Sequence, residues 1–272
     1  MTTVRALLQE SELPRREAEL LLEAITGLSR VQMFTRPDAD VGTEQTRQFK
    51  SFCARRASRE PLAYIIGERE FWSLPLRVTP DVLIPRPDTE CLVSWANEIL
   101  IQLTQPACLD LGTGSGAIAL AIKSECPSCE VIGVDISAAA LEVARLNSRC
   151  LELPVEWREG SWFEPVRGRR FPLIVANPPY IPDNDSHLLE GDLPAEPQHA
   201  LRGGPDGLAC LRALADDGQD YLLSGGWLLL EHGWDQGQAV RELLAVAGWV
   251  AIETRLDLAG RERVTGARRA HE

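Results

Sequence analysis

The sequence has no long hydrophobic run and is short of positive charge. Its 272 residues include 28 Lys and Arg against 40 Asp and Glu, so the formal net charge is -12. A chain that is negative overall repels phosphate backbones, which argues against a broad nucleic-acid-binding surface. No apolar stretch approaches the roughly 20 residues needed to cross a bilayer, and the N-terminus MTTVRALLQESELPRREAE is amphipathic and acidic. We therefore expect a cytoplasmic protein with no membrane association and no stable nucleic-acid binding.

Cysteine and histidine pairs with the spacing of metal ligands are also scarce in the sequence. The chain has 7 cysteines, an odd number without regular spacing, which is typical of reduced thiols in a reducing compartment. Cys126 and Cys129 form a C-x-x-C in ECPSCE, but no second ligand pair with zinc spacing occurs in the sequence. Pro127 places the pair in a turn between a helix and a strand, whereas a lowered thiol pKa needs a helix start. We predict two semi-buried thiols and no metal site, with a redox role as the alternative.

The first 70 residues carry helical patterns and no cluster of reactive side chains. In ESELPRREAELLLEAITG, Pro14 suits a first helical turn, apolar residues recur at helical spacing, and Gly27 suits a helix end. A second helix is predicted from about residue 43, with basic residues on one side. We expect a small helical bundle over 1–70 that recognises a substrate. Its basic side chains are interpreted as a solvated face, with a binding patch as the alternative: Arg55, Arg56 and Arg59.

Residues 71–87 are expected to form an extended, hairpin-like connector, because the prolines in EFWSLPLRVTPDVLIPRP forbid a helix. The sequence Asp-Thr-Glu at 88–90 suits the cap of a helix over 91–103. Beyond it, strands and helices alternate. The predicted strands are 107–111, 130–135, 155–158, 172–176, 226–232, 249–256 and 262–268, and the predicted helices are 116–124, 138–149, 206–223 and 236–247.

This alternation predicts an α/β fold over 88–272. We expect a doubly wound, seven-stranded and mostly parallel sheet of the Rossmann-like kind, covered by helices on both faces. The last two strands have no helix between them, so one of them should be antiparallel. Ligands bind such sheets at the carboxyl ends of the strands, where three motifs stand.

The first motif is LDLGTGSGAIAL at 109–120, a strand that breaks into glycines and then a helix. Glycines let the backbone turn sharply and approach a ligand closely, and the helix start offers free amides. A tight strand-to-helix turn without a ligand is the alternative. The spacing differs from the G-x-G-x-x-G of dinucleotide enzymes, which counts against a pyrophosphate. The candidate residues are Gly112, Thr113, Gly114, Ser115 and Gly116.

The second motif is VIGVDIS, which places Asp135 at the end of the next strand. A carboxylate at that point accepts both hydroxyls of a ribose. The alternative is a helix cap for the segment that follows Ser137. Together with the glycine loop, Asp135 favours ribose binding.

The third motif is VANPPYIP, in which an apolar strand ends at Asn177, Pro178, Pro179 and Tyr180. The prolines fix an extended backbone and remove two amide donors; a rigid turn explains them but explains neither Asn177 nor Tyr180. The carbonyls of Asn177 and Pro178 and the Asn177 side-chain oxygen remain as acceptors, which suits a planar NH2 group. The lone pair of such a nitrogen is delocalised, which makes it a poor nucleophile. Hydrogen bonds to both of its hydrogens favour positive charge on the nitrogen and direct its free lobe toward an electrophile. With the sulfonium methyl of S-adenosylmethionine as electrophile, the reaction is in-line methyl transfer to nitrogen, without a metal.

The combination of GTGSG, the VIGVD strand end and NPPY resembles class I S-adenosylmethionine-dependent methyltransferases that act on planar nitrogens, including DNA adenine and protein glutamine enzymes. More specifically, YIIGEREFWSLPLRVTPDVLIPRPDTE, LDLGTGSGAIALAI, NPPYIP, GGWLLLEHG and RERVT resemble, in this order, the peptide chain release factor N5-glutamine methyltransferase family. The likeness runs from about residue 60 to the C-terminus. The segment before it is similar to that family's N-terminal bundle in pattern only, and the ending VTGARRAHE departs from the family.

The resemblance implies that the five residues of the glycine loop hold S-adenosylmethionine, that Asp135 holds its ribose, and that Trp162 in GSWFEP flanks its adenine. By itself Trp162 would be interpreted as a packing residue. The resemblance further implies that the NPPY residues hold the glutamine from the Gly-Gly-Gln loop of a class 1 release factor. Asn177, Pro178 and Tyr180 are the implied catalytic residues, with Asn177 also beside the cofactor.

Three histidines follow strands or lie in loops. We expect His232 in LEHG to have a structural hydrogen-bonding role, because methyl transfer from a sulfonium needs no deprotonation before attack; a general base is the alternative. His187 and His199 lie in the long loop after NPPY, which suits a substrate-facing flap or a simple surface loop.

Two other functions compete with protein glutamine methylation. A DNA adenine-N6 methyltransferase would flip its base against the same acceptors, but the acidic charge argues against it. The second is a non-catalytic nucleotide-binding module. The presence of both NPPY and an intact cofactor loop argues against it.

Overall fold

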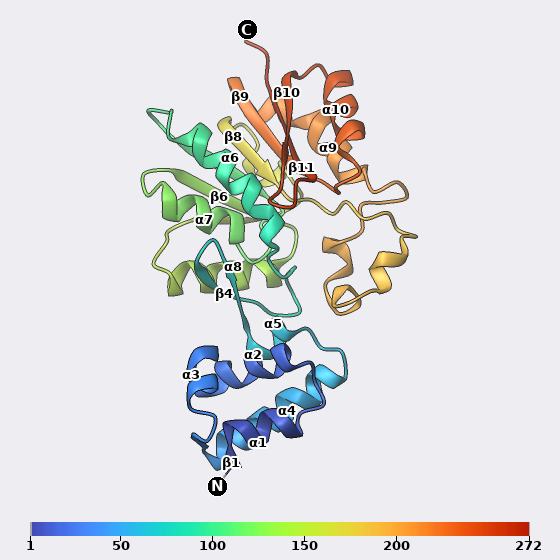
Figure 1. The fold of residues 1–272 in the computed structure, drawn as a ribbon. Helices are drawn as coiled ribbons and strands as arrows, with labels where there is room; N and C mark the ends of the chain where they lie inside the picture. The colour runs from blue at the N-terminus through green and yellow to red at the C-terminus, as the bar shows by residue number, and fades with distance from the viewer. Residues whose placement is uncertain (1, 272) are drawn as a thin grey trace. The chain divides into compact units, whose positions relative to one another are not determined.

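The structure, a computed structural model, describes residues 2–271, which divide into two compact units. The helical unit runs to Glu68 and also contains Gly191–Ala195. The sheet unit comprises Arg69–Glu190 and the chain from Glu196 onward. Figure 1 shows the elements of each unit along the chain.

The helical unit is built from short helices around a small apolar core. Its elements are β1 (Thr2–Thr3), α1 (Val4–Glu10), α2 (Arg15–Thr26), α3 (Arg30–Thr35), β2 (Asp40–Val41), α4 (Thr43–Ala57) and α5 (Leu62–Ile66). As predicted, α2 follows Pro14 and ends at Gly27, whose φ of 72° suits a residue without a side chain. Leu21, Leu22 and Phe49 are buried in the core of this unit.

The predicted solvated face on α4 is wrong at Arg56. Its side chain is 19% exposed, and it donates to Glu17 Oε2 and to Asp192 Oδ1, each at 2.8 Å. Arg55 pairs with Glu60, whereas Arg59 is exposed beyond the helix end. Helical periodicity cannot reveal a partner such as Asp192, because that residue comes from a distant loop.

A hairpin forms as predicted, but it is shifted toward the N-terminus of the expected 71–87: its strands are β3 (Glu68–Phe71) and β4 (Leu74–Arg77). Trp72 and Ser73 between them have φ values of 53° and 60°, which is the twist that a two-residue hairpin turn requires. A 3-10 turn (Pro87–Thr89) then leads into α6 (Glu90–Leu100). The predicted cap is wrong here: Thr89 makes no side-chain hydrogen bond to the first turn, and its hydroxyl instead accepts from Asn177.

The large sheet has the predicted seven strands. They are β5 (Ala107–Leu111), β6 (Glu130–Asp135), β7 (Glu156–Glu159), β8 (Phe171–Ala176), β9 (Leu222–Glu231), β10 (Val250–Leu256) and β11 (Glu262–Arg268), in the order β10-β11-β9-β8-β5-β6-β7. Strands β5 to β9 pair in parallel, and β11 is antiparallel to both neighbours, as the missing helix before it predicted.

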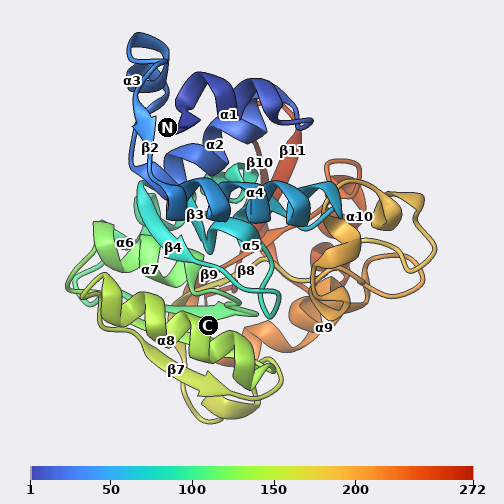
Figure 2. The same ribbon diagram turned by 90° about the horizontal axis from the view of Figure 1, so that it is seen from below.

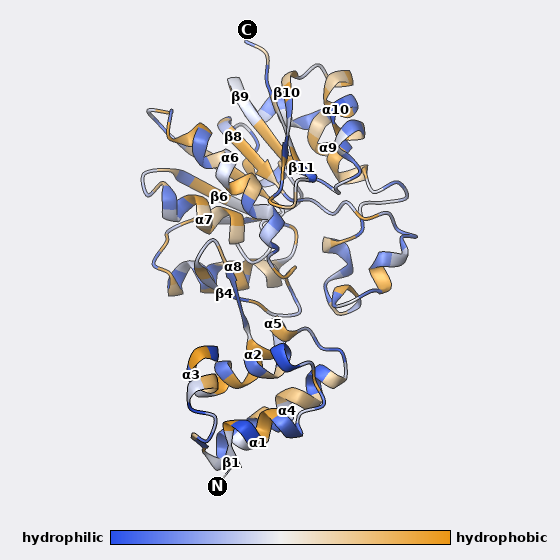
Figure 3. Ribbon diagram, in the orientation of Figure 1, coloured by the Kyte–Doolittle hydropathy of each residue, from blue (hydrophilic) through white to orange (hydrophobic). Residues whose placement is uncertain are grey.

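Helices cover both faces of this sheet (Figure 1). On one face, α6 and α7 (Ala117–Glu125) pack in a core that includes Trp95, Leu120 and Val175. On the other face lie α9 (Ala209–Asp217) and α10 (Gly237–Val246), while α8 (Ala138–Cys150) packs beside the edge strand β7 (Figure 2). Figure 3 shows β8 coloured as hydrophobic, and this strand is buried between the two helix layers.

One predicted helix is too long. The segment 206–223 holds α9 only to Asp217, then a 3-10 turn (Gly218–Tyr221), and β9 begins at Leu222. β9 continues through Gly225 and Gly226, with Gly225 at a φ of 73°, and so begins before the predicted strand 226–232. The pairing of β8 with β9 has a register shift in this region, which accommodates the irregular backbone of β9 at Gly225. The sequence pattern did not predict this shift.

The register of the parallel strands aligns their carboxyl ends. Leu111 pairs with both Val134 and Ala176, and Ala176 pairs with Leu230. The residues that follow these partners therefore emerge at one edge of the sheet. They are Gly112, Asp135, Asn177 and Glu231.

The C-x-x-C lies in the predicted turn, between α7 and β6. Cys126 is half-buried and Cys129 is buried, and burial raises the pKa of the Cys129 thiol to about 12. Such a thiol forms little reactive thiolate near neutral pH.

None of the helices within residues 2–271 combines the length and apolar character that crossing a membrane requires.

Candidate active site

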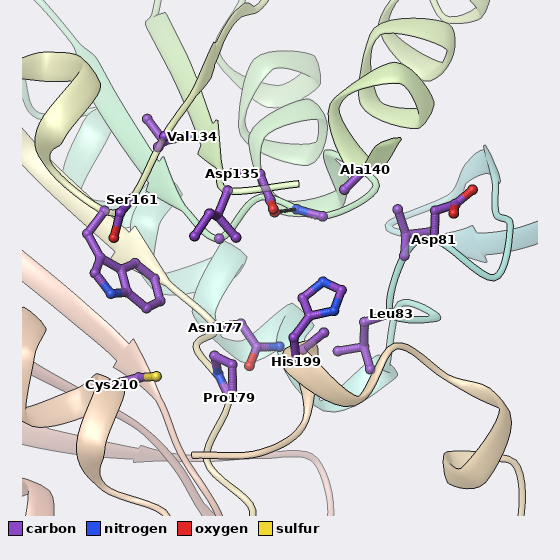
Figure 4. Close-up of a pocket in the computed structure, with 17 residues that line it drawn as sticks. Asp81, Leu83, Val134, Asp135, Ala140, Ser161, Asn177, Pro179, His199 and Cys210 are labelled. Atoms are coloured by element: carbon purple, nitrogen blue, oxygen red, sulfur yellow. Dashed lines mark hydrogen bonds between the residues drawn. The ribbon is translucent and has the colours of Figure 1, made fainter. Parts of the chain in front are cut away.

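A cavity of about 180 Å³ opens at the carboxyl edge of the sheet (Figure 4). Segments far apart in the chain form its wall. They are residues 81–83 of the connector, Gly112 and Gly114, residues 134–136, Ala140, residues 160–162, Asn177 and Pro179, His199 and Ala200, and Cys210.

The glycine loop is held firmly from behind. The amides of Gly112 and Thr113 both donate to the Val134 carbonyl, at 2.8 and 3.0 Å, and Thr113 Oγ1 donates to Asp110 Oδ2 at 2.5 Å. Gly112 and Gly114 have φ values of 71° and 56°, which favour glycine. The threonine is thereby turned inward, and the bare glycine backbone lines the cavity.

Asp135 is bound by two backbone amides. Its Oδ2 accepts from Gly114 N at 2.8 Å and its Oδ1 from Ser137 N at 2.9 Å. The cap of α8 is Ser137, whose hydroxyl accepts from Ala140 N, so the capping alternative for Asp135 is not observed. A carboxylate oxygen has more than one acceptor position, so Asp135 retains capacity for hydroxyl donors from a ligand in the cavity.

The cavity is acidic. Asp81 and Asp135 line it, and no Lys or Arg stands among the described lining residues. Behind the glycine loop, burial raises the pKa of Asp110 to about 7, against the opposing hydrogen bond from Thr113. This lining attracts a cationic ligand and repels a pyrophosphate.

Trp162 supplies a flat aromatic wall. It follows β7 at a φ of 42°, and its ring lies so close to Gly112 that a Cβ there would stand 3.6 Å from Trp162 Cζ3. Trp162 lines the cavity and also packs against the core of the sheet unit, so its role beside an adenine stays a prediction.

At the tip of β8, Asn177 and Pro179 line the cavity, while Pro178 is buried. Asn177 Nδ2 donates to Thr89 Oγ1 at 3.3 Å. The Tyr180 hydroxyl donates to Glu231 Oε1 at 3.5 Å, and the Tyr180 carbonyl accepts from Gln236 Nε2 at 2.9 Å. Tyr180 therefore anchors the tip from behind, and burial raises the pKa of its phenol.

Glu231 is a buried carboxyl behind the tip that no motif singled out. Burial raises its pKa to about 7, while the Thr89 hydroxyl and the Arg263 guanidinium lower it. The acidic residue inside the apolar run LLLEH is the signal that would have found it, because a charge rarely interrupts a buried strand without a role.

His232 has the predicted structural role. The Gly233 carbonyl only accepts, so Nδ1 carries the proton in that 2.8 Å contact, and Nε2 accepts from Thr265 Oγ1 at 2.8 Å. Burial lowers the pKa of His232, which keeps the ring neutral. In the loop after the tip, His187 is exposed and contacts Asp185, whereas His199 lines the cavity.

The structure thus brings together Gly112, Gly114, Asp135, Trp162, Asn177 and Pro179 around one cavity. The other residues proposed from the motifs stand outside the described lining: Thr113, Ser115, Gly116, Pro178 and Tyr180. Residues 81–83 and 199–200 also belong to the lining, although the sequence analysis placed only His199 in a possible substrate-facing flap and gave residues 81–83 no role. Only the folded chain brings these two segments to the cavity.

Two family models match the chain: the PrmC N-terminal domain over residues 1–67 and the Methyltransferase small domain over residues 89–204. Release factor glutamine methyltransferase from Aliivibrio fischeri is 46% identical over 260 residues, covering 95% of this chain and 91% of the relative. The protein of that name from Escherichia coli is 46% identical over 261 residues, covering 95% and 93%.

A solved structure of a methyltransferase from Pyrococcus furiosus aligns with a TM-score of 0.55 at 17% identity, covering 80% of this chain and 97% of that one. At that identity the match supports the fold alone. The sequence relatives extend over both the helical unit and the sheet unit. The chain belongs to the family of release factor glutamine methyltransferases.

Proposed function

We propose that this protein transfers a methyl group from S-adenosylmethionine to the side-chain nitrogen N5 of the glutamine in the Gly-Gly-Gln motif of class 1 peptide chain release factors, and so modulates translation termination. The observation that carries the proposal is the orientation of Asn177. Its amide nitrogen is bound to Thr89, so the oxygen is left as a hydrogen-bond acceptor at the wall of an acidic cavity.

The cavity residues fit the cofactor. S-adenosylmethionine carries a sulfonium, and when bound it would supply an electrophilic methyl group. The acidic lining without Lys or Arg among the described residues suits this positive charge. Asp135 would accept the ribose hydroxyls, Trp162 would flank the adenine, and the bare backbone at Gly112 and Gly114 allows close approach.

The tip of β8 suits a primary amide. Asn177 Oδ1 and the Pro178 carbonyl would accept its two hydrogens, and Pro178 and Pro179 offer no competing amide donor. Acceptors fixed in place favour positive charge on the nitrogen and direct its lone pair toward an electrophile. Thr89 and Tyr180 hold the tip in place, so its acceptors are preorganised.

The proposed domain roles follow the sequence pattern. Residues 1–70 would recognise the release factor, residues 71–87 connect, and residues 88–272 carry the methyltransferase chemistry. In the helical unit, α2 and α4 present charged residues on the surface, including Arg15 and Lys50.

The test is methyl transfer from labelled S-adenosylmethionine. The purified protein is incubated with a class 1 release factor, with the same factor carrying alanine in place of the motif glutamine, and with duplex DNA. Label on the first factor but not on its alanine variant supports the proposal. Label on DNA alone would favour an adenine-N6 methyltransferase, and failure to bind the cofactor would favour a non-catalytic module.

A further inference from the structure

Glu196 is a completely buried carboxylate in the loop that follows the β8 tip. None of its side chain is exposed, and its Oε2 accepts from the backbone amide of Ile84 at 3.0 Å. Its Oε1 pairs with Arg86, whose side chain is 34% exposed. The guanidinium of Arg86 and the amide of Ile84 together compensate the cost of burying a charge. Glu196 is therefore held in one position by specific partners.

The residues on both sides of this contact are close in sequence to residues that line the cavity. Ile84 follows residues 81–83, which line it, and Glu196 precedes His199 and Ala200, which line it as well. Figure 4 shows Leu83 and His199 among the residues that line the cavity. Glu196 therefore joins two wall segments that are distant in the sequence.

The far side of the same loop is fastened to the tip of β8. Ile181 N donates to the Leu201 carbonyl at 3.0 Å, and Gly203 N donates to the Ile181 carbonyl at 2.8 Å. A 3-10 turn (Gln198–Ala200) lies between this attachment and Glu196. The segment that carries His199 is thus held at both ends, by backbone bonds at one end and by the Glu196 carboxylate at the other.

We propose that Glu196 is a positioning residue that clasps residues 81–83 to residues 199–200 and thereby slows the escape of the bound cofactor. The proposal rests on the proposed function, since it concerns the same cavity. Without the carboxylate, the Ile84 amide loses its acceptor and Arg86 loses its partner. Residues 81–83 and 199–200 can then separate and open the cavity wall. Asn177 and the glycine loop keep their own hydrogen bonds, which do not involve Glu196.

The experiment measures release of S-adenosylhomocysteine from the full-length protein by stopped-flow fluorescence and its affinity by calorimetry. Glu196→Ala should raise the dissociation rate and the dissociation constant about tenfold or more, because two hydrogen-bonded supports of the wall are lost. Single-turnover methyl transfer at saturating cofactor should stay within about threefold of wild type, which gives a KM effect without a comparable kcat effect. Glu190→Ala, an exposed change in the same loop, is the matched control and should release the cofactor at the wild-type rate.

A second pair of variants separates positioning from folding. Arg86→Lys keeps the charge partner and should release the cofactor at nearly the wild-type rate, whereas Arg86→Ala, which leaves the Ile84 bond in place, should release it faster. If Glu196→Ala and Arg86→Ala only lower the thermal midpoint of the free protein and leave cofactor release unchanged, the role of Glu196 is overturned. If the wild type itself binds no cofactor, the proposed function fails and this inference fails with it.

Discussion

The side-chain nitrogen of Asn177 donates to Thr89 Oγ1 at 3.3 Å, across 88 residues of sequence. An amide has one donor end and one acceptor end, so engaging the nitrogen decides that the oxygen is left for a ligand. Figure 4 shows Asn177 at the cavity, where such an acceptor is needed to hold an NH2 group. The polarity of the proposed amide site is thus set by a residue in the turn before α6.

Replacing Asn177 tests that acceptor directly. Asn177→Ala removes Oδ1, and we expect methyl transfer to fall by about a hundredfold or more, since a preorganised acceptor at the reacting group is lost. The affinity for S-adenosylhomocysteine should change by less than about threefold. Single-turnover transfer and calorimetry measure the two effects, and near-normal turnover would refute the amide-holding role.

Thr89 should affect methyl transfer through the orientation of Asn177, although its hydroxyl also contacts the buried Glu231 carboxyl. Thr89→Val keeps the shape but removes the acceptor for Asn177 Nδ2, so the amide loses its fixed direction and the transfer rate should fall about tenfold. Thr89→Ser retains the hydroxyl and serves as the control. Equal rates for the valine and serine variants would show that this hydrogen bond has no part in catalysis.

Asp135 should act on cofactor binding before it acts on rate. Asp135→Ala removes the acceptor of the Gly114 amide as well as the proposed ribose contact, and the dissociation constant of S-adenosylmethionine should rise about tenfold or more. Asp135→Asn keeps one acceptor oxygen and should give an intermediate value. Calorimetry decides the matter: an unchanged affinity in the alanine variant would remove the ribose assignment.

Gly203 lets the loop after the tip approach the NPPY backbone. A Cβ at this position would stand 2.7 Å from the Pro179 carbonyl oxygen and 2.8 Å from Tyr180 Cα, so Gly203→Ala should displace the tip and lower methyl transfer about tenfold or more. Gly42→Ala is the control, because Gly42 has a φ of -56° and its Cβ would meet only Gln45 Oε1 at 3.5 Å. If both variants transfer methyl groups at the wild-type rate, the close approach is dispensable.

Asp110 should make stability depend on pH. Its pKa is raised from 3.8 to about 7 by burial, so the native state binds this proton more tightly than the unfolded chain does. The contribution of Asp110 to the free energy of unfolding is therefore present below about pH 4 and is lost as the pH rises through about 7. Asp110→Asn should flatten this loss, whose slope for one carboxyl is at most about 1.4 kcal/mol per pH unit.

Urea unfolding of both proteins between about pH 4 and pH 8 measures the difference. Glu231, whose pKa is raised in the same direction, remains in the single variant, so some pH dependence should persist there. Asp110→Asn combined with Glu231→Gln should flatten the profile further. Parallel profiles for wild type and Asp110→Asn would contradict the raised pKa.

Local patterns predicted the elements well where one residue type forces one conformation. Pro14 and Gly27 bound α2, the prolines around Trp72 leave only a hairpin, and the apolar runs at β5, β6 and β8 form buried strands, because each of these features acts within a few residues. The prediction was wrong at the start of β9, because Leu222 pairs with Phe171 of β8 where the sequence pattern predicted a helix to 223.

The sequence by itself determined the alternation of strands and helices in the sheet unit, the glycine loop, the carboxylate after β6 and the NPPY tip. All of these depend on spacing along the chain. Tertiary structure alone decided which way the site residues face: Thr113 turns inward to Asp110, Tyr180 turns back to Glu231, and Asn177 is oriented by Thr89. The physical reason is that hydrogen-bond partners and burial are set by segments far apart in sequence, which meet only when the parallel strands align their carboxyl ends.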